Sequence, residues 1–274
     1  MDERYRTDRA AIMAQRLVNG GDYWATSDGR WGVGAPYSTL DCGLMLCELG
    51  LAPSGIIAKG IAAVLFRSWE EDGRIRPGPD LPVQPCHTAN AARLLCRLGY
   101  ADDPRLIRTK GWFLSQQHAD GGWRCSRVKL GASADTDASN PGVTLNVLDA
   151  FRFTADAGDA ALDSAVDSLL EHWTTRRPMG PCGFGIGSRF MQVEFPFNRY
   201  NLFSYVYVLS FYARARRSRA FMDALAVLRG KLVDGAMIIE HQRPGLEDLE
   251  FCREGVPSKL ATARCAEIIA NTKT

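Results

Sequence analysis

The chain has 274 residues, of which 46% are apolar and 23% charged, and its 33 Lys and Arg against 31 Asp and Glu leave a net charge of +2. This composition supplies a sizeable core and excludes an intrinsically disordered chain. The small charge surplus argues against a nucleic-acid or membrane-surface binder, which would need a broad basic face. We therefore expect no nucleic-acid partner, and the sequence does not specify a protein partner.

The first residues, Met1 to Arg6, are charged and lack the apolar segment of a secretory signal. The most apolar stretch, residues 200–213, is shorter than the roughly 20 residues that span a bilayer. We therefore expect a cytoplasmic protein without an integral membrane segment. In that compartment the eight cysteines serve as thiols, metal ligands or core residues rather than as disulfides.

Two kinds of helical segment alternate along the chain, one amphipathic with a single apolar stripe and one apolar on all sides. Starting with an amphipathic segment, they are predicted in this order: residues 8–18, 40–49, 56–69, 89–98, 106–117, 143–151, 162–172, 202–212, 220–232 and 260–269. No segment alternates with the period of two that is typical of a strand, so we predict no sheet. The fold class is therefore all-α.

The links between these segments carry recurring Asp-Gly turns, at Asp28-Gly29, Asp72-Gly73, Asp120-Gly121 and Asp234-Gly235. Apolar helices belong inside and amphipathic helices outside, as in a helical solenoid that curves shut. We expect residues 1–274 to form a single α/α toroid domain of about five inner/outer helix pairs, with a linear two-layer solenoid as the alternative. The long links lie on one rim, where we expect the functional loops.

Residues 116–123, with the sequence QQHADGGW, resemble the glutamine–tryptophan repeat of squalene and hopene cyclases. The β subunits of protein prenyltransferases share that repeat more loosely. Residues 86–90, 98–104 and 121–125 also look like the small bacterial prenyltransferase/squalene-oxidase-repeat proteins. The resemblance implies an α/α toroid and a structural role for the glutamines and Trp123. One fold supports many reactions, so the reaction has to be argued from the site.

The cysteines divide into two groups by their place in this pattern. Three lie inside the apolar segments and are typical of small buried side chains: Cys47, Cys96 and Cys265. The other five fall on links or at the starts of apolar helices, and therefore on the predicted rim: Cys42, Cys86, Cys125, Cys182 and Cys252.

The best metal candidates are Cys86, His87 and Cys125, because thiolate and imidazole are the ligands that zinc prefers. The start of a helix also favours the thiolate form of Cys86. No Cys-x-x-Cys pair is present, so the ligands would come from separate repeats. Cys42, Cys182, Asp137 or water would take the fourth position. We expect zinc as cofactor, with rim cysteines that share no metal as the alternative.

Residues 135–138, with the sequence DTDA, resemble the Asp-x-Asp-Asp motif of class II terpene cyclases, whose middle aspartate protonates an alkene or epoxide. Asp137 matches that acid, but Ala138 replaces the last aspartate. The same residues fit a helix cap before Pro141, or a metal ligand. Asp135 and Asp137 are therefore catalytic candidates. Arg199, which precedes an aromatic segment, is a third, either as a partner of an anionic group or in a surface ion pair.

These features predict a small-molecule enzyme that resembles terpene cyclases and prenyltransferases and acts on an isoprenoid or other lipophilic substrate in a central cavity. Two alternatives stay open: a metal enzyme acting on a non-isoprenoid metabolite, and a non-catalytic binding or scaffold protein that uses the repeat surface. Metal-ligating side chains that converge on a closed cavity would favour an enzyme. Dispersed cysteines on a flat polar rim would favour a binding protein.

Overall fold

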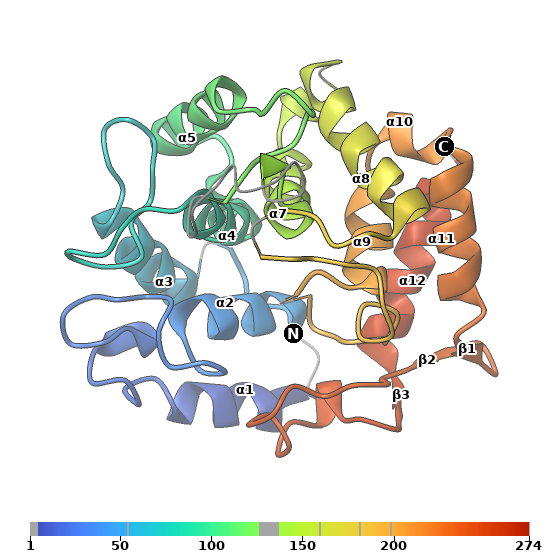
Figure 1. Cartoon of the computed structure of the whole chain (residues 1–274). Coiled ribbons are helices and arrows are strands. Elements are labelled where there is room, and N and C mark those ends of the chain that lie inside the picture. Colours follow the sequence, from blue (N-terminus) through green and yellow to red (C-terminus); the bar gives the residue numbers. More distant parts are fainter. Residues whose placement is uncertain are drawn as a thin grey trace.

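The computed structural model describes residues 5–53, 55–125, 137–158, 160–180, 182–197 and 199–273, and these residues are mostly helical (Figure 1). The α-helices are α1 (Arg6–Ala14), α2 (Thr39–Glu48), α3 (Ile56–Arg67), α4 (Pro85–Leu95), α5 (Pro104–Ser115), α7 (Pro141–Phe151), α8 (Asp163–Thr175), α9 (Leu202–Leu209), α10 (Ala213–Arg216), α11 (Arg219–Arg229) and α12 (Lys259–Asn271). Shorter helical turns are η2 (Asp22–Trp24), η3 (Cys96–Tyr100), η4 (Ala155–Gly158), η5 (Ala160–Leu162) and η6 (Glu250–Cys252). Every predicted helical segment overlaps one of these α-helices, which confirms the mostly helical class.

The helices differ in burial as their sequences predict. In Figure 1, α2, α4, α7 and α9 lie toward the middle of the molecule, with α1, α3, α5, α8 and α11 around them. Every residue of α9 is buried, whereas α11 buries one stripe, made of Phe221, Ala224, Leu225 and Leu228. Helix α12, which we predicted among the apolar ones, buries only Ala261, Cys265 and Ile268. Its polar positions keep the rest of its surface accessible.

A small sheet near the C-terminus corrects the prediction of no strands. Strands β1 (Leu232–Val233), β2 (Ala236–Ile238) and β3 (Pro257–Ser258) pair antiparallel in the order β1-β2-β3. The predicted Asp234-Gly235 turn is the hairpin between the first two, and both residues have positive φ, 48° and 77°. Strands of two or three residues are too short to show an alternating pattern, which is why the sequence did not reveal them.

The QQHADGGW segment ties neighbouring helices together, as the resemblance implies. Trp123 is buried and its indole Nε1 donates to the carbonyl of Phe113 in α5 at 2.8 Å. Gln117 donates through Nε2 to the carbonyls of Gly121 at 2.6 Å and Ala161 at 3.1 Å. Trp24 makes the corresponding contact with Ile12 of α1, at 3.0 Å. The turn therefore fixes the end of one outer helix against the residues that begin the next.

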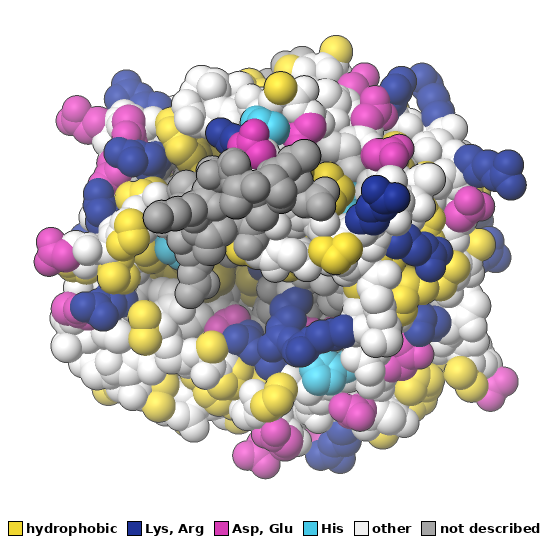
Figure 2. Space-filling view, in the orientation of Figure 1, with side chains coloured by type: hydrophobic (Ala, Val, Ile, Leu, Met, Phe, Trp, Pro, Cys, Tyr) yellow, Lys and Arg dark blue, Asp and Glu magenta, His cyan; other side chains and the backbone are white. Residues whose placement is uncertain are grey.

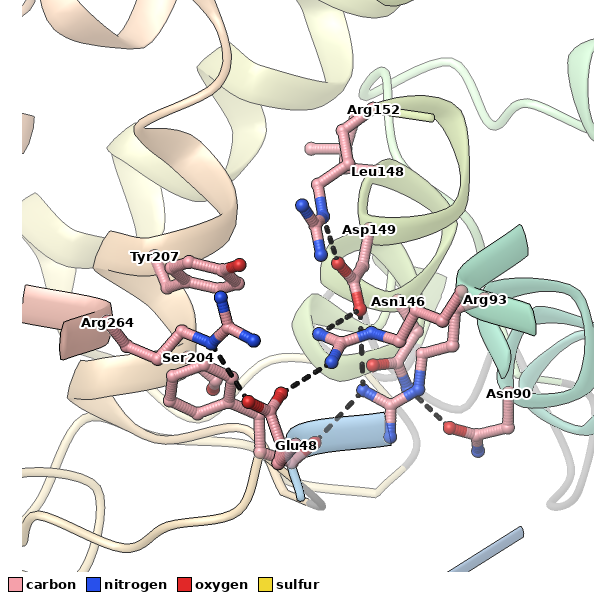
Figure 3. Close-up of polar contacts among 12 residues, drawn as sticks. Glu48, Asn90, Arg93, Asn146, Leu148, Asp149, Arg152, Ser204, Tyr207 and Arg264 are labelled. Carbon is pink, nitrogen blue, oxygen red and sulfur yellow. Dashed lines mark hydrogen bonds and ion pairs between the residues drawn. The ribbon is translucent and has the colours of Figure 1, made fainter. Parts of the chain in front are cut away.

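The interior also holds a charged network that the sequence pattern did not predict (Figure 3). Glu48 of α2 accepts from Arg97 of η3 at 2.6 Å and from Arg264 of α12 at 2.8 Å. Asp149 of α7 accepts from Arg152 at 2.6 Å and from Arg97 at 3.3 Å. Side chains from helices far apart in sequence thus meet in the middle of the molecule.

Burial alone would raise the pKa of both carboxyls in this network. For Asp149 the guanidinium groups of Arg97, Arg152 and Arg93 outweigh that effect, so its pKa lies below the usual range. For Glu48 the guanidinium groups of Arg97 and Arg264 likewise lower the pKa. Both carboxyls are therefore ionised at neutral pH.

No α-helix in the described part of the chain combines the length and the apolar character that a membrane span needs.

Candidate functional site

A cavity of about 500 Å³ opens between the first turns of α4 and α7 and the link that joins α8 to α9. Its lining combines three cysteines, four asparagines, three charged side chains and three aromatic rings. The residues are Cys86, Asn90, Cys125, Asn140, Gly142, Val143, Asn146, Cys182, Gly183, Phe184, Gly185, Arg189, Phe190, Glu194, Arg199, Tyr200 and Asn201. Figure 2 shows that the face turned to the viewer is hollowed near its middle, with Lys and Arg side chains gathered there beside a histidine.

Two of the predicted metal ligands meet at this cavity. Cys86 lies in the first turn of α4, and Cys125 follows the buried Trp123, whose carbonyl accepts the backbone N–H of Asn140 at 2.8 Å. The two sulfur atoms are 3.9 Å apart, within hydrogen-bond reach and far beyond a disulfide bond. The hydrogen bond to Cys125 and burial raise the pKa of the Cys86 thiol. Cys182 lines the same cavity and contributes to that shift.

The separation of the two sulfur atoms fits a shared tetrahedral metal ion. Two thiolates at the usual Zn–S distance of about 2.3 Å stand about 3.8 Å apart when the angle between them is tetrahedral. The observed 3.9 Å matches that edge without movement of the helix. Within the described ranges, however, no group of three His, Cys, Asp or Glu side chains is close enough to hold a metal ion. The structure thus brings together two ligands of a candidate zinc site, and Cys182 is a further thiol on the cavity wall.

His87 and Cys42 lie apart from the thiol pair. His87 turns its ring edge-on to Trp31, with 6.3 Å between the centroids, and lines a neighbouring cavity of about 400 Å³. Cys42 is buried in α2 beside Asp41, which pairs with Arg243. Burial raises the pKa of the Cys42 thiol. Successive residues of a helix point in different directions, which explains why His87 does not follow Cys86 into the cavity.

The predicted acid motif lies partly outside the described residues, because Asp135 belongs to residues 126–136. Asp137 is described: its side chain is 49% exposed and forms an ion pair with Arg124. It is not among the residues that line the cavity. Alkene protonation needs a carboxyl that burial keeps uncharged, and the described side chain of Asp137 is half exposed.

Arg199, the third catalytic candidate, does line the cavity. Its Nε lies 3.7 Å from Glu194 Oε1, and the carboxylate of Glu194 is also 3.8 Å from the Nε2 of His241. Arg189 lines the cavity as well. The two guanidinium groups give this part of the cavity a positive charge that one buried carboxylate offsets only in part.

Two further pairs at the cavity were missed by sequence reasoning. His172 is fully buried and its Nδ1 lies 2.7 Å from the hydroxyl of Tyr200, while its Nε2 lies 3.0 Å from the carbonyl of Arg177. Because the carbonyl can only accept, Nε2 carries the proton and Nδ1 accepts from Tyr200. On the opposite wall Asn146 donates to Asn90 at 3.0 Å.

One signal for the second pair is present in the sequence. Cys86, Asn90, Arg93 and Arg97 follow one another at intervals of four, three and four residues, which places them on one face of a helix. A polar stripe at that spacing inside an otherwise apolar helix predicts a lined cavity or a buried polar network. The structure contains both.

Comparisons with known proteins assign no family. No family model matches the sequence, and no curated protein matches it. Among solved structures, a variant of the type II terpene cyclase MstE from Scytonema, in complex with its substrate geranylgeranyl dihydroxybenzoate, has a TM-score of 0.45 and 14% sequence identity, over 98% of this chain and 83% of that chain. So distant a likeness gives the protein neither a family nor an activity.

Proposed function

We propose that the protein is a small-molecule enzyme whose active site is the cavity at Cys86 and Cys125, with zinc held by those two thiolates. The single observation that carries this proposal is the 3.9 Å separation of the two sulfur atoms on the wall of a 500 Å³ cavity. A cavity of that size is within the range that holds small ligands. Cys182 is the further ligand that we propose, and a fourth position is left for substrate or water.

The scaffold that we propose for this site is a closed α/α toroid of about five inner/outer pairs in a single domain. The alternation of buried and striped helices supports it, and so does the single apolar core formed by residues from α1 to α12. The contact between Glu48 and Arg264 joins the first inner helix to the last. In such a ring the starts of α4 and α7 lie on one rim, which places the thiols beside each other.

The substrate that the cavity favours has an anionic group and an apolar part. Arg189 and Arg199 suit a diphosphate or carboxylate, since guanidinium groups bind such oxyanions with two parallel hydrogen bonds. Phe184, Phe190 and Tyr200 offer aromatic faces to an apolar chain. An isoprenoid diphosphate has both parts, in keeping with the resemblance of the sequence to prenyltransferases and terpene cyclases.

In this proposal the side chains of the chain bind and orient the substrate. Zinc, when bound, supplies a Lewis acid that activates an oxygen or sulfur atom next to it. Arg199 and Arg189 hold the anionic group, and the aromatic rings exclude water from the apolar part. The proposed mechanism uses no acid at Asp137, because its carboxylate pairs with Arg124 on the surface.

A second candidate function is a metal enzyme acting on a more polar, non-isoprenoid metabolite. The observation that favours it is the set of four cavity asparagines: Asn90, Asn140, Asn146 and Asn201. Amide groups bind hydroxyl, amide and carboxylate groups, and they offer little to a long hydrocarbon chain.

The test is turnover by the zinc-loaded protein, followed by mass spectrometry. Two panels are offered, one of allylic diphosphates and one of small polar carboxylates and phosphates. We expect one panel to be consumed, with the activity absent in Cys125→Ala and retained in Cys265→Ala, a matched variant of a buried cysteine in α12. Consumption from the polar panel alone would select the second candidate. Turnover that Cys125→Ala leaves unchanged would refute the zinc mechanism, and no turnover of either panel would favour a binding protein.

A further inference from the structure

Arg93 of α4 is a buried cation whose hydrogen bonding is incomplete. Its side chain is 5% exposed. Its Nη1 donates to the carbonyl of Phe197 at 3.2 Å and lies 4.0 Å from the Oδ2 of Asp149. Its Nε and Nη2 have no hydrogen-bond partner anywhere in the described ranges. Buried N–H groups of a cation are seldom left unsatisfied, because each one has lost its water without a replacement.

The surrounding charges do not supply the missing partner (Figure 3). Four guanidinium groups share the two buried carboxylates of the network, those of Glu48 and Asp149: they belong to Arg93, Arg97, Arg152 and Arg264. A third carboxylate, that of Glu267, contacts Arg264 at the more exposed edge. Asp149 lies closer to Arg152 and Arg97 than to Arg93. Positive charge is therefore in excess around Arg93.

Arg93 keeps its charge at neutral pH. Burial is the main cause that lowers its pKa, to about 10, which still leaves the guanidinium protonated. An excess cation in a poorly solvated interior attracts an anion much more strongly than it would in water.

Asn90 is the residue of α4 that links Arg93 to the cavity. Asn90 lies one helical turn before Arg93, lines the 500 Å³ cavity and also lines the neighbouring cavity of 400 Å³. Its Oδ1 accepts from Asn146, so its Nδ2 remains as a donor. Arg93 itself is not among the residues that line either cavity, so an anion would have to pass the amide of Asn90 to reach its guanidinium.

We propose that Asn90, on the cavity wall, and Arg93, one helical turn beyond it, form an oxyanion site for a group the size of a phosphate or carboxylate. The site is distinct from Arg189 and Arg199, which lie on the α8–α9 link. The evidence for this site is the unsatisfied guanidinium of Arg93 and not the thiol pair. The oxyanion site and the zinc site can therefore be refuted independently of each other.

The test uses the purified chain with inorganic phosphate as the probe. Melting temperatures are measured over a series of phosphate concentrations, with sodium gluconate holding the ionic strength constant. Above its Kd, we expect each tenfold rise in phosphate to raise the Tm by about 3 °C. The Arg93→Met variant, which removes the charge and keeps most of the side-chain volume, should lose this dependence when it is compared in an Arg189→Met/Arg199→Met background, where the phosphate response of those two guanidinium groups is absent.

Three further variants make the result specific. Asn90→Ala should weaken phosphate binding about tenfold, and it serves as the test if Arg93→Met does not fold. Arg214→Met removes an exposed arginine that pairs with Asp167 and should keep the full dependence on phosphate. Cys265→Ala, a change at a buried cysteine of α12 outside the cavity, should also keep it. A wild-type Tm that does not respond to phosphate, or an equal response in Arg93→Met or in Asn90→Ala, would overturn the proposal.

A second probe identifies where the oxyanion comes from. Phenyl phosphate carries the same group on an apolar ring that can lie in the cavity. If it binds more tightly than phosphate and the difference is lost in Phe184→Ala, which removes a ring from the cavity wall, the site holds the anionic end of a cavity ligand. If the two bind equally, the site holds a free ion. Both results require Arg93.

Discussion

Glu48 and Arg264 are 216 residues apart in the sequence, yet the Oε2 of Glu48 accepts a hydrogen bond from the Nε of Arg264 at 2.8 Å. This contact joins α2 to α12 across the middle of the molecule. The carboxylate of Glu48 is almost fully buried and also serves Arg97. A polar contact thus holds the second helix of the chain, α2, against the last helix, α12, in addition to apolar packing.

Removal of the Glu48 charge should therefore destabilise the fold. We expect Glu48→Gln to cost about 3–5 kcal/mol, because it leaves two guanidinium groups without their buried partner. Urea unfolding followed by circular dichroism measures the change. The matched control is Asp167→Asn, which breaks the exposed pair with Arg214 and should cost far less than Glu48→Gln. Equal losses in the two variants would show that the network is not a stability element.

The same network predicts how stability depends on pH. The pKa values of Glu48 and Asp149 are lowered in the folded state, so their contribution is complete above the unfolded values of about 4. This contribution to stability is lost as the pH falls through the lower pKa values of the folded state. We expect a steep fall in the urea midpoint below about pH 4. Asp149→Asn should flatten that fall, and an unchanged slope in this variant would contradict the assignment.

The tryptophan turn makes a prediction of its own. Trp123→Ala should cost about 3–5 kcal/mol, because it removes a buried ring and leaves the carbonyl of Phe113 without its donor. Trp123→Phe keeps most of the packing and should lose about 1 kcal/mol from the hydrogen bond. Trp112, which is only partly buried, provides the control, and Trp112→Ala should cost less than Trp123→Ala. A melting temperature that Trp123→Ala does not change would show that the motif is not structural here.

Thiol labelling should separate the cysteines by location. Cys96 and Cys252 are buried, and burial raises the pKa values of both thiols to about 12, so they stay protonated and covered at neutral pH. Cys182 is exposed. We therefore expect iodoacetamide to modify Cys182 first in native, metal-free protein, and Cys96 and Cys252 only after unfolding, as read by peptide mass spectrometry. Early labelling of Cys96 would mean that the end of α4 opens more readily than its packing indicates.

Much of the fold was predictable, because helix burial follows the distribution of apolar residues. The all-round apolar character of α9 and the single stripe of α11 can be read directly from their sequences. The charged network was not predicted, because Glu48 and Asp149 lie in apolar segments and most of their arginine partners are far away in sequence. The approach of Cys86 to Cys125 was predicted from their places on one rim. The sequence did not predict that His87 points away from Cys86 or that Cys42 lies apart from the thiol pair. Both depend on the direction of a side chain, which its place on the rim does not determine.

The proposed function depends most on a zinc ion that Cys86 and Cys125 share. The most direct test is elemental analysis of the purified protein, with the metal content expressed per chain. We predict about one zinc per chain, lost in both Cys86→Ala and Cys125→Ala and retained in Cys265→Ala. Fully stable, active protein that contains no metal would contradict the shared zinc site, as would a Cys86→Ala or Cys125→Ala variant that keeps its zinc.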